Sequence, residues 1–290
     1  MQGHYWDKTT FVGEEHARGM KAYDRTMAHV EDMLRTAKPD IVVFDGDICD
    51  ERGRTEWNQL MECWTQLISY VEKYGVLWTF VPGNHENDVK EEYWERCKLI
   101  EIYAAYPKYC LSVGQKSFNH VLNIVKGTIL MAMFDSHGDK PANKDGLKDE
   151  VEPAVVAAFD KYMDDHFDCT KTENATAPGK QVEKDALRLA FLHIPLRQFP
   201  PTVENNEGKL LSGILSKARK LNGVDTGLYE KLQKHQFDGV FCGNDHHSDA
   251  CMVRGDEKTT ANIWLCYNRV GAFTPPSEWE GKVHLPFAGR

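Results

Sequence analysis

Apolar residues in the first third of the chain alternate between two kinds of spacing. In residues 15–36, and again in 56–73, the apolar side chains recur every three or four positions, which predicts two amphipathic helices. Each of these segments precedes a short apolar run, "IVVF" at 41–44 and "VLWTFV" at 76–81, of the kind that forms buried strands. A third helix is predicted over about 90–105. This part of the chain is therefore expected to alternate helices with strands.

The pattern after the third helix is dominated by short apolar runs. The runs "CLSV" (110–113), "HVLNIV" and "TILMAMF" predict strands separated by short turns, as in an antiparallel meander. The remaining predicted elements are helices near 151–165 and 226–235 and the strands "LRLAFL", "DGVFC", "CMVR" and "NIWLCY". Helices alternate with strands in the first part of the chain, and strands follow one another in the later part. This order indicates a two-sheet α/β core with helices on its outer faces, in a single domain over 1–290.

Composition narrows the class of protein. The 290 residues carry a formal net charge of -9, which argues against a protein that coats nucleic acid or anionic lipid. No run of about 18 apolar residues could span a membrane, and the first ten residues lack the apolar core of a signal peptide. The eight cysteines are scattered without a CxxC pair, so we expect them to be mostly reduced and the protein to be cytoplasmic. A secreted or vacuolar location is the alternative if the amino terminus is truncated.

Four polar clusters share one position in the pattern, because each directly follows a predicted buried strand. They are "DGDICD" (45–50), "GNHEND" (83–88), "HIPL" (193–196) and "GNDHH" (243–247). Ligands in layered α/β proteins gather at the carboxyl ends of such strands, so the loops are expected to bring together Asp47, Asn84, His85, His193 and His246. One carboxylate, one amide oxygen and several imidazoles suit borderline divalent metals such as Zn, Mn or Fe.

Each cluster also has an ordinary structural interpretation. "DGD" and Gly-Asn are common turn residues, a single histidine such as His193 is often an interior residue, and the pair His246–His247 fits a solvated bend. For the ordinary interpretation to be correct, all four clusters would have to be unrelated turns or interior residues. Each of them would also have to follow a strand, in this order along the chain, by coincidence. We therefore favour a metal site over four unrelated turns.

The ordered motifs resemble those of one known family. The set Gly46-Asp47, Gly83-Asn84-His85-Glu86, His193 and Gly243-Asn244-Asp245-His246 resembles the calcineurin-like metallophosphoesterase superfamily, whose motifs run DxH, GD, GNH(E/D), H and GHxH. The stretches "HIPLRQF", "FCGNDHHSD", "FDSHG" and "LCYNRVGAF" are similar to its purple-acid-phosphatase-like branch. The likeness covers nearly the whole chain. It implies a four-layer αββα sandwich with a two-metal site at one edge of the sheets.

The resemblance also implies a metal-binding role for the matched residues. Asp47 corresponds to the carboxylate that bridges both metals, and Asn84 and His193 correspond to ligands of the second metal. His246 and His4 correspond to ligands of the first metal. Two metals about 3.5–4 Å apart polarise the phosphoryl oxygens and lower the pKa of bound water towards about 7, and the hydroxide attacks phosphorus in line.

Three further residues receive supporting roles from the same resemblance. His85 corresponds to the family's non-ligand histidine beside the phosphate, which acts as a general acid or stabilises the transition state. Glu86 and Asp245 are expected to orient imidazoles.

Two positions depart from the family pattern. Gln2 stands where the first motif has Asp, with His4 at its His position, and the central strand that precedes this motif is expected to be missing through truncation. Losing such a strand costs about 2–5 kcal/mol for each large buried side chain removed. Asn244 replaces the first His of GHxH, and an amide oxygen is a weaker partner for a borderline metal than imidazole. Asp47 is then the only anionic member of the set, and the candidates to compensate are Asp50, Asp245, His137 and His247.

The sequence therefore predicts a metal-dependent phosphoesterase that hydrolyses phosphomonoesters of a small molecule or a phosphoprotein. Two divalent ions (Mn, Zn or Fe) are expected from the family. Gln2 and Asn244 leave two alternatives open, the loading of a single ion and an inactive pseudophosphatase that acts as a binding or scaffold module. Neither nucleic acid nor a membrane is expected as a partner. Substrate choice is expected to reside in the variable loops 136–150, 168–186 and 200–225.

Overall fold

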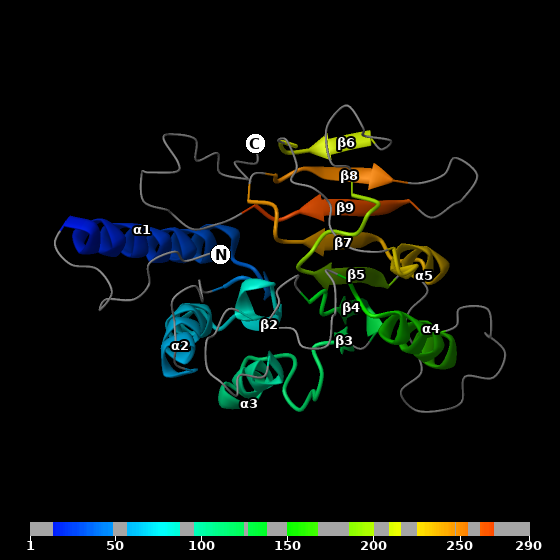
Figure 1. The fold of residues 1–290 in the computed structure, drawn as a ribbon, viewed down its shortest axis with the longest axis horizontal. Helices are drawn as coiled ribbons and strands as arrows, with labels where there is room; N and C mark the ends of the chain where they lie inside the picture. Colours follow the sequence, from blue (N-terminus) through cyan, green and yellow to red (C-terminus); the bar gives the residue numbers. More distant parts are fainter. Residues whose placement is uncertain are drawn as a thin grey trace.

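Helices and strands alternate along the chain, and Figure 1 shows how the computed structural model arranges them. The structure describes residues 14–48, 57–87, 96–124, 127–137, 150–167, 186–199, 209–215, 225–246, 248–254 and 262–269. The helices are α1 (Glu14–Ala37), α2 (Trp57–Lys73), α3 (Glu101–Ala105), α4 (Pro153–Phe167) and α5 (Leu228–Lys234), with short 3-10 helices η1 (His85–Asn87) and η2 (Arg96–Ile100). The strands are β1 (Ile41–Asp45), β2 (Leu77–Val81), β3 (His120–Ile124), β4 (Ile129–Met133), β5 (Leu187–Leu192), β6 (Lys209–Ser212), β7 (Gly239–Cys242), β8 (Cys251–Arg254) and β9 (Ile263–Tyr267).

The strands form two sheets. The smaller sheet pairs β1 with β2 in parallel. The larger sheet has seven strands in the order β3-β4-β5-β7-β9-β8-β6, and its neighbouring strands β4, β5, β7 and β9 run parallel to one another. Because parallel strands end at the same edge of a sheet, the loops that follow these four strands meet at one edge.

Hydrophobic clusters fill the spaces between the layers. Between the two sheets, Val81 of β2 belongs to one cluster with Met133 of β4 and Phe191 of β5. The outer face of the smaller sheet packs against the first three helices, and the outer face of the larger sheet packs against α4 and α5. Figure 1 shows α1, α2 and α3 on one side and α4 and α5 on the other. The order helices, sheet, sheet, helices is the four-layer αββα arrangement that the sequence predicted.

The central strands are apolar on both faces because both faces are buried. In β5, Leu189 and Phe191 belong to the layer between the sheets, whereas Ala190 and Leu192 face α4 and α5. Successive side chains of a strand point to opposite faces. A strand covered on both sides therefore reads as a continuous apolar run, which is why "LRLAFL" predicted β5 with its correct bounds.

Two strand predictions need correction. The run "CLSV" is not a strand: Cys110 forms only an isolated bridge to Trp78, and the main chain of Leu111 donates to the Trp78 carbonyl at 2.8 Å. The strand β6 was missed, because it lies inside the stretch 200–225 that was expected to be a variable loop. It pairs with β8 through a register shift between Leu210 and Ser212, and such a short, irregular edge strand leaves little periodic signal. The missing central strand and residues 90–95 of the third helix lie outside the described residues.

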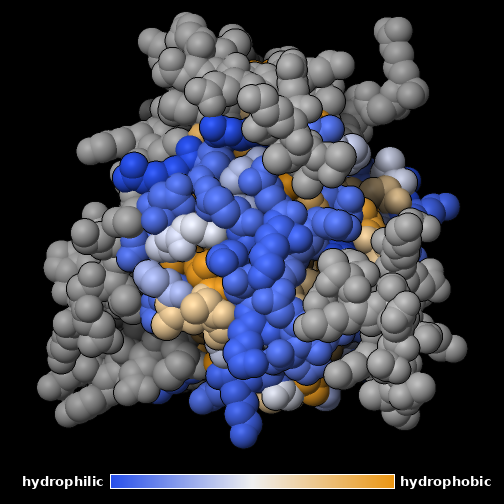
Figure 2. Space-filling model, turned by 90° about the vertical axis from the view of Figure 1, so that its right-hand side faces the viewer, coloured by the Kyte–Doolittle hydropathy of each residue, from blue (hydrophilic) through white to orange (hydrophobic). Residues whose placement is uncertain are grey.

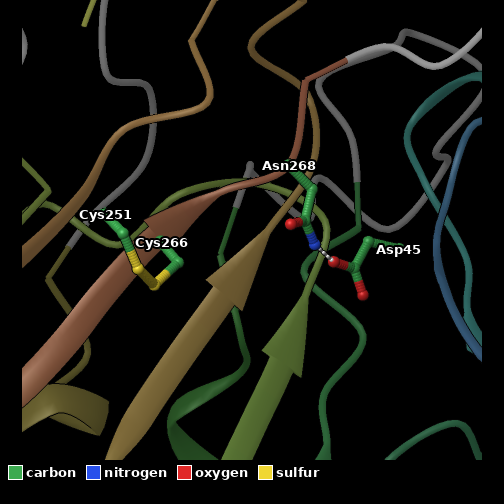
Figure 3. The surroundings of a disulfide bond; sticks show 4 residues. All are labelled: Asp45, Cys251, Cys266 and Asn268. Atoms are coloured by element: carbon green, nitrogen blue, oxygen red, sulfur yellow. Dashed lines mark hydrogen bonds between the residues drawn. A yellow bond between two sulfur atoms is a disulfide. The ribbon is translucent and has the colours of Figure 1, made fainter. Parts of the chain in front are cut away.

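The cysteines that the structure describes include two free thiols and one disulfide. Cys110 and Cys242 are free and buried. Cys251 and Cys266 form a disulfide, because they stand directly opposite each other on β8 and β9 with Cα atoms 4.1 Å apart. Figure 3 shows this disulfide close to the carboxyl end of β9. It joins the two strands at the edge of the sheet where the polar loops emerge.

The outer surface over α4 and α5 is polar. Figure 2, which looks onto this side of the molecule, shows mainly hydrophilic atoms where the residues are described. Lys234 of α5 contacts Asp160 and Asp164 of α4 at 2.7 and 2.8 Å, so an ion-pair network spans the two helices. In the part of the chain that is described, no helix is long and apolar enough to cross a membrane.

A buried polar chain connects β2 to β3. Thr79 and Ser112, both fully buried, share a hydrogen bond of 2.6 Å, and the Ser112 hydroxyl lies 2.8 Å from Nε2 of His120. Nδ1 of His120 lies 2.9 Å from the Ser117 carbonyl oxygen, which can only accept. Nδ1 therefore carries the proton, and Nε2 accepts from Ser112. Burial of this neutral ring lowers the pKa of His120 to about 4.

The depressed pKa of His120 predicts an acid-sensitive fold. Below about pH 6.5 the unfolded chain protonates this histidine, whereas the folded chain resists protonation until about pH 4. Stability should therefore fall by up to about 3 kcal/mol as the pH drops through this window. Urea unfolding at several pH values should show a flatter pH profile for His120→Gln than for the wild type. The control His166→Gln, on the exposed end of α4, should keep the wild-type profile. Equal slopes for all three proteins would contradict the prediction.

Candidate functional site

The loops after β1, β2, β5 and β7 lie in direct contact, and three glycines make this possible. A Cβ atom on Gly46, whose φ is +80°, would lie 2.4 Å from the Gly83 nitrogen, and one on Gly83 would lie 2.3 Å from Asp47 Oδ1. A Cβ atom on Gly243 would lie 2.6 Å from the Asp45 carbonyl oxygen and 2.9 Å from His193 Nδ1. No side chain fits at these distances, so the loops approach one another backbone to backbone.

Three of the predicted ligands touch one another at this junction. His193 Nε2 lies 3.1 Å from Asp47 Oδ2 and 3.0 Å from Asn84 Oδ1. His193 Nδ1 lies 2.5 Å from the Asp45 carbonyl oxygen, to which it can only donate. Nε2 of the neutral ring would then present its lone pair to two oxygen acceptors. A proton shared between His193 and Asp47, or a cation bound among the three atoms, would satisfy this arrangement.

The charges of Asp47 and His193 shift each other's pKa. Burial alone would raise the pKa of Asp47, but the positive charge and hydrogen bond of His193 hold it well below the ordinary value. Burial alone would lower the pKa of His193, but the Asp47 carboxylate raises it. An oxygen pair and an imidazole nitrogen are also a donor set that borderline divalent metals accept. The residues present therefore fit a metal as well as they fit a proton.

Glu86 fixes the position of Asp47. It is fully buried, and its carboxylate accepts hydrogen bonds from the backbone N–H groups of Asp47, Ile48 and Gly83 at 3.0, 2.9 and 2.7 Å. The charge of Glu86 also contributes to raising the pKa of His193, and its role in orienting an imidazole stays a prediction. The carboxylate joins the loop after β1 to the loop after β2.

His85 contributes its backbone to the same junction. Its N–H donates to Asp47 Oδ1 at 2.7 Å, so this oxygen is occupied and Oδ2 faces His193. The His85 side chain is partly exposed, in the first position of η1. It is therefore accessible from the edge of the sheets.

The loop after β7 carries two more of the predicted ligands. Asn244 has a φ of 60°, in the left-handed region, and His246 is partly exposed two residues further on. Asp245 accepts from the Ser248 N–H at 3.1 Å, which stabilises the turn, and its role in orienting an imidazole stays a prediction. Gly243 brings the beginning of the loop against His193.

Of the other predicted site residues, the structure describes only His137. His4, Gln2, Asp50 and His247 lie outside the described residues. His137, a candidate to compensate for the missing charge, has a φ of 55° and lies 3.3 Å from Glu152 and 3.9 Å from Asp135. Its neighbour Ser136 accepts from the Ile194 N–H at 2.9 Å, so the loop after β4 is held against the residue that follows His193.

Sequence reasoning missed Asp45 and Asn268. Asp45 is only 8% exposed, and its Oδ2 accepts a hydrogen bond from the Asn268 side chain at the end of β9 (Figure 3). Its Oδ1 is buried and has no hydrogen-bond partner within the described ranges. Burial raises the pKa of Asp45 to about 7. The available signal was an aspartate closing the otherwise apolar strand "IVVFD", where β-branched and aromatic residues precede it.

A second carboxylate–imidazole cluster lies between the outer helices. Asp160, Asp164 and His235 place their ligand atoms within 4.8 Å of one another. Lys231 and Lys234 lie 2.7 Å from the Asp160 carboxylate, and His235 Nε2 lies 2.7 Å from it. Because the lysines already neutralise the carboxylates, these residues stabilise the contact between α4 and α5, and we assign no metal there.

Comparison with known proteins agrees with this architecture. A family model described as calcineurin-like phosphoesterase matches residues 8–248. This match covers most of the chain, which therefore belongs to the calcineurin-like phosphoesterase family. In three dimensions the chain is similar to a dimetal phosphatase from Danio rerio, with a TM-score of 0.53 and 13% identity over 86% of this chain and 79% of that chain. At this identity the likeness concerns the fold.

Two curated relatives extend the comparison to sequence. "Phosphatase DCR2" of Saccharomyces cerevisiae is 25% identical over 87% of this chain and 43% of its own length. "Probable inactive purple acid phosphatase 14" of Arabidopsis thaliana is 22% identical over 83% of this chain and 61% of its own length. The chain thus spans about half the length of these relatives, and the purple-acid-phosphatase-like resemblance is confirmed.

The Glu86 hydrogen bonds generate a prediction about stability. In Glu86→Gln the amide NH₂ group would face backbone N–H donors, so at least one buried donor loses its acceptor. We expect a loss of about 2–4 kcal/mol in the free energy of unfolding, measured with urea. The matched control is Glu31→Gln, which breaks an exposed ion pair with Lys73 and should cost less than about 1 kcal/mol. Equal losses for the two variants would show that the buried bonds are not important.

Proposed function

We propose that this chain hydrolyses phosphomonoesters at a two-metal site built around Asp47, Asn84 and His193. The observation that carries the proposal is the convergence of these three side chains, with His193 Nε2 within 3.1 Å of both oxygens. Family membership supports the reaction class, because the family is one of phosphoesterases.

Each ligand receives a role from its place at the junction. Asp47 would help to hold the ions, because its Oδ2 faces His193 Nε2 at 3.1 Å while the His85 N–H fixes the orientation of its carboxylate. Asn84 and His193 would hold the second ion, with the Asn244 amide oxygen in place of the family's imidazole. His246 and His4 would hold the first ion. When bound, the two ions polarise the phosphoryl oxygens and lower the pKa of water.

His85 is the residue that we assign to proton transfer. Its backbone is fixed by Asp47, and its side chain is partly exposed where a phosphate would approach. An imidazole in this position would donate a proton to the leaving oxygen or stabilise the negative charge that develops in the transition state. Because its position depends on the Glu86 bonds, loss of Glu86 would also misplace this group.

The neighbours of His193 in the chain, Leu192 and Ile194, line a pocket together with Ser136, Arg197 and Gln198. The described lining of this pocket does not include the proposed metal ligands. Arg197 is exposed, and an arginine suits a phosphorylated substrate. We infer that the substrate is a phosphorylated small molecule or a phosphoprotein.

The second candidate function is a metal-poor binding module. It is favoured by Asn244, where the family places an imidazole, and one relative carries the word "inactive" in its name. A weak second ion would leave the fold intact, because the junction is held by Glu86 and by glycine contacts without a metal. Elemental analysis decides between the two functions: two tightly bound ions per chain would argue strongly against the binding module.

Phosphatase activity can be tested with a chromogenic phosphomonoester. With added Mn²⁺ or Zn²⁺ we expect turnover, and His85→Ala should lower kcat by about 10²–10⁴-fold, because it removes the proton-transfer group. His166→Ala, on α4, is the matched control and should leave kcat unchanged. Absence of turnover with any divalent metal would overturn the proposed activity. Full activity in His85→Ala would overturn the role of that residue.

A further inference from the structure

The disulfide between Cys251 and Cys266 anchors the loop that joins β7 to β8 (residues 243–250). This loop begins directly after β7 and ends directly before Cys251, the first residue of β8. Cys251 stands opposite Cys266 of β9, to which it is bonded. The same loop carries two of the proposed ligands, Asn244 and His246. The disulfide therefore fixes the far end of a loop that belongs to the candidate site.

Hydrogen bonds to an irregular edge of the sheet also hold the end of this loop. The Ala250 carbonyl accepts from the Tyr267 N–H at 2.9 Å, and Asp249 exchanges two hydrogen bonds with the main chain of Ile214, just beyond β6. Strand β6 has only four residues and pairs with β8 through a register shift. Short edge segments of this kind open locally at a lower free energy than central strands do. The covalent link is therefore expected to matter most at this end of the loop.

The disulfide also restrains the chain that follows β9. Asn268 lies two residues after Cys266. Its main chain donates to the Cys242 carbonyl at 2.7 Å, and its side chain donates to Asp45. Figure 3 shows the disulfide and the Asn268–Asp45 pair on the same stretch of chain. A change at the disulfide can therefore reach the junction from the side of β9 as well as through the loop.

The disulfide is accessible to solvent from one side. Cys251 is partly exposed, whereas Cys266 is only 4% exposed. Trp264 lies two positions before Cys266, and therefore on the same face of β9, and it is 51% exposed. A thiol can thus approach the Cys251 sulfur from this face. Exposed disulfides are reduced more readily than shielded ones.

The free thiol of Cys242 does not compete for this disulfide. Cys242 belongs with Val240 to the layer under α4 and α5, whereas Phe241, the partner of Cys266 in the ladder, belongs to the layer between the sheets. Cys242 and Cys266 therefore lie on opposite faces of the sheet. Burial also raises the pKa of the Cys242 thiol, which keeps it protonated and unreactive. After reduction, Cys251 and Cys266 remain the pair that can form the bond again.

We propose that the Cys251–Cys266 disulfide is a reversible thiol switch that controls the order of the loop between β7 and β8. A thiolate of an external dithiol attacks the Cys251 sulfur, the S–S bond breaks, and Cys266 leaves as a thiolate that takes up a proton. The second thiol of the reductant then attacks the mixed disulfide and releases Cys251 as a thiol. Two electrons pass to the protein, the dithiol becomes a disulfide, and an oxidised dithiol reverses the reaction. The change in the loop is independent of the proposed function, and only its effect on turnover rests on it.

Hydrogen exchange of the full chain, without substrate or added metal, tests the loop directly. In dithiothreitol under native conditions, we expect wild-type peptides that cover 243–250 to exchange about tenfold faster than in the oxidised chain. Peptides that cover β5 should keep their protection, and re-oxidation should restore slow exchange in the loop. Alkylation of free thiols followed by mass spectrometry reports the state of Cys251 and Cys266 in each sample.

Variants separate this disulfide from the other cysteines. The double variant Cys251→Ala/Cys266→Ala should show the loop exchange of the reduced wild type, with or without dithiothreitol. The matched control is Cys110→Ala, which removes a buried free thiol outside the loop and should respond to dithiothreitol as the wild type does.

Three results would overturn the switch. They are a disulfide that dithiothreitol does not reduce in the native chain, a reduced chain whose loop exchanges as slowly as before, and a loss of protection that extends to β5. The last result would mean that the disulfide holds the whole fold and not the loop. If the double variant fails to fold, the reduced and oxidised wild type decide by the same criteria.

A phosphatase assay distinguishes this inference from the proposed activity. After removal of the dithiol and addition of Mn²⁺, the reduced wild type should hydrolyse the phosphomonoester about tenfold more slowly than the oxidised form, because displaced groups lose their catalytic geometry. Equal turnover of the two forms would overturn the link between the switch and the site. A loop that responds in a chain without any turnover would overturn the proposed function and leave the switch standing. Turnover in a chain whose loop ignores reduction would do the reverse.

Discussion

The carboxylate of Glu86 holds together the part of the molecule on which the rest of the site depends. Three backbone N–H groups from two loops point at it, and all the atoms involved are buried. Asp47 has a φ of 49°, a conformation that a residue with a side chain adopts only when its surroundings enforce it. The bonds to Glu86 supply that constraint. They fix Asp47 so that one oxygen meets the His85 N–H and the other meets His193.

The electrostatics of the junction follow from how well each buried carboxylate is compensated. Glu86 is satisfied by N–H dipoles, and Asp47 by a backbone N–H and the His193 ring. Among the described residues, Asp45 has one side-chain hydrogen bond for its two carboxylate oxygens. Hydrogen bonds and opposite charge make burial of a carboxylate tolerable, whereas an uncompensated oxygen favours either a proton or a cation. The junction therefore has a physical reason to bind positive charge that is independent of family membership.

The fold places this charge-binding junction where several strands end. The smaller sheet supplies Asp45, Asp47 and the residues after β2, and the larger sheet supplies His193, Asn244 and Asn268. The two sheets meet through an apolar layer that includes Val81 and Phe191. The apolar layers hold the sheets together, and the polar loops meet at their common edge. Membership of the calcineurin-like phosphoesterase family agrees with this division.

Much of this architecture was predictable because it depends on local pattern. Helical spacing predicted α1 and α2, continuous apolar runs predicted β1, β5 and β7, and the ordered motifs led to Asp47, Asn84 and His193. Pattern failed where a segment is neither periodic nor long, as at β6 and at "CLSV", whose backbone bonds depend on neighbours distant in the sequence.

The sequence by itself determined the layers and the family motifs. The layers follow from the spacing of apolar residues, and the motifs consist of particular residue types in a fixed order. Only the tertiary structure decided which hydrogen-bond partners compensate each buried carboxylate for the loss of water. Glu86 accepts hydrogen bonds from three backbone N–H groups, and Asp45 accepts from Asn268 across 223 positions of the chain. The physical reason is that a hydrogen bond depends on distance and direction in space, and these are set when the two sheets pack against each other.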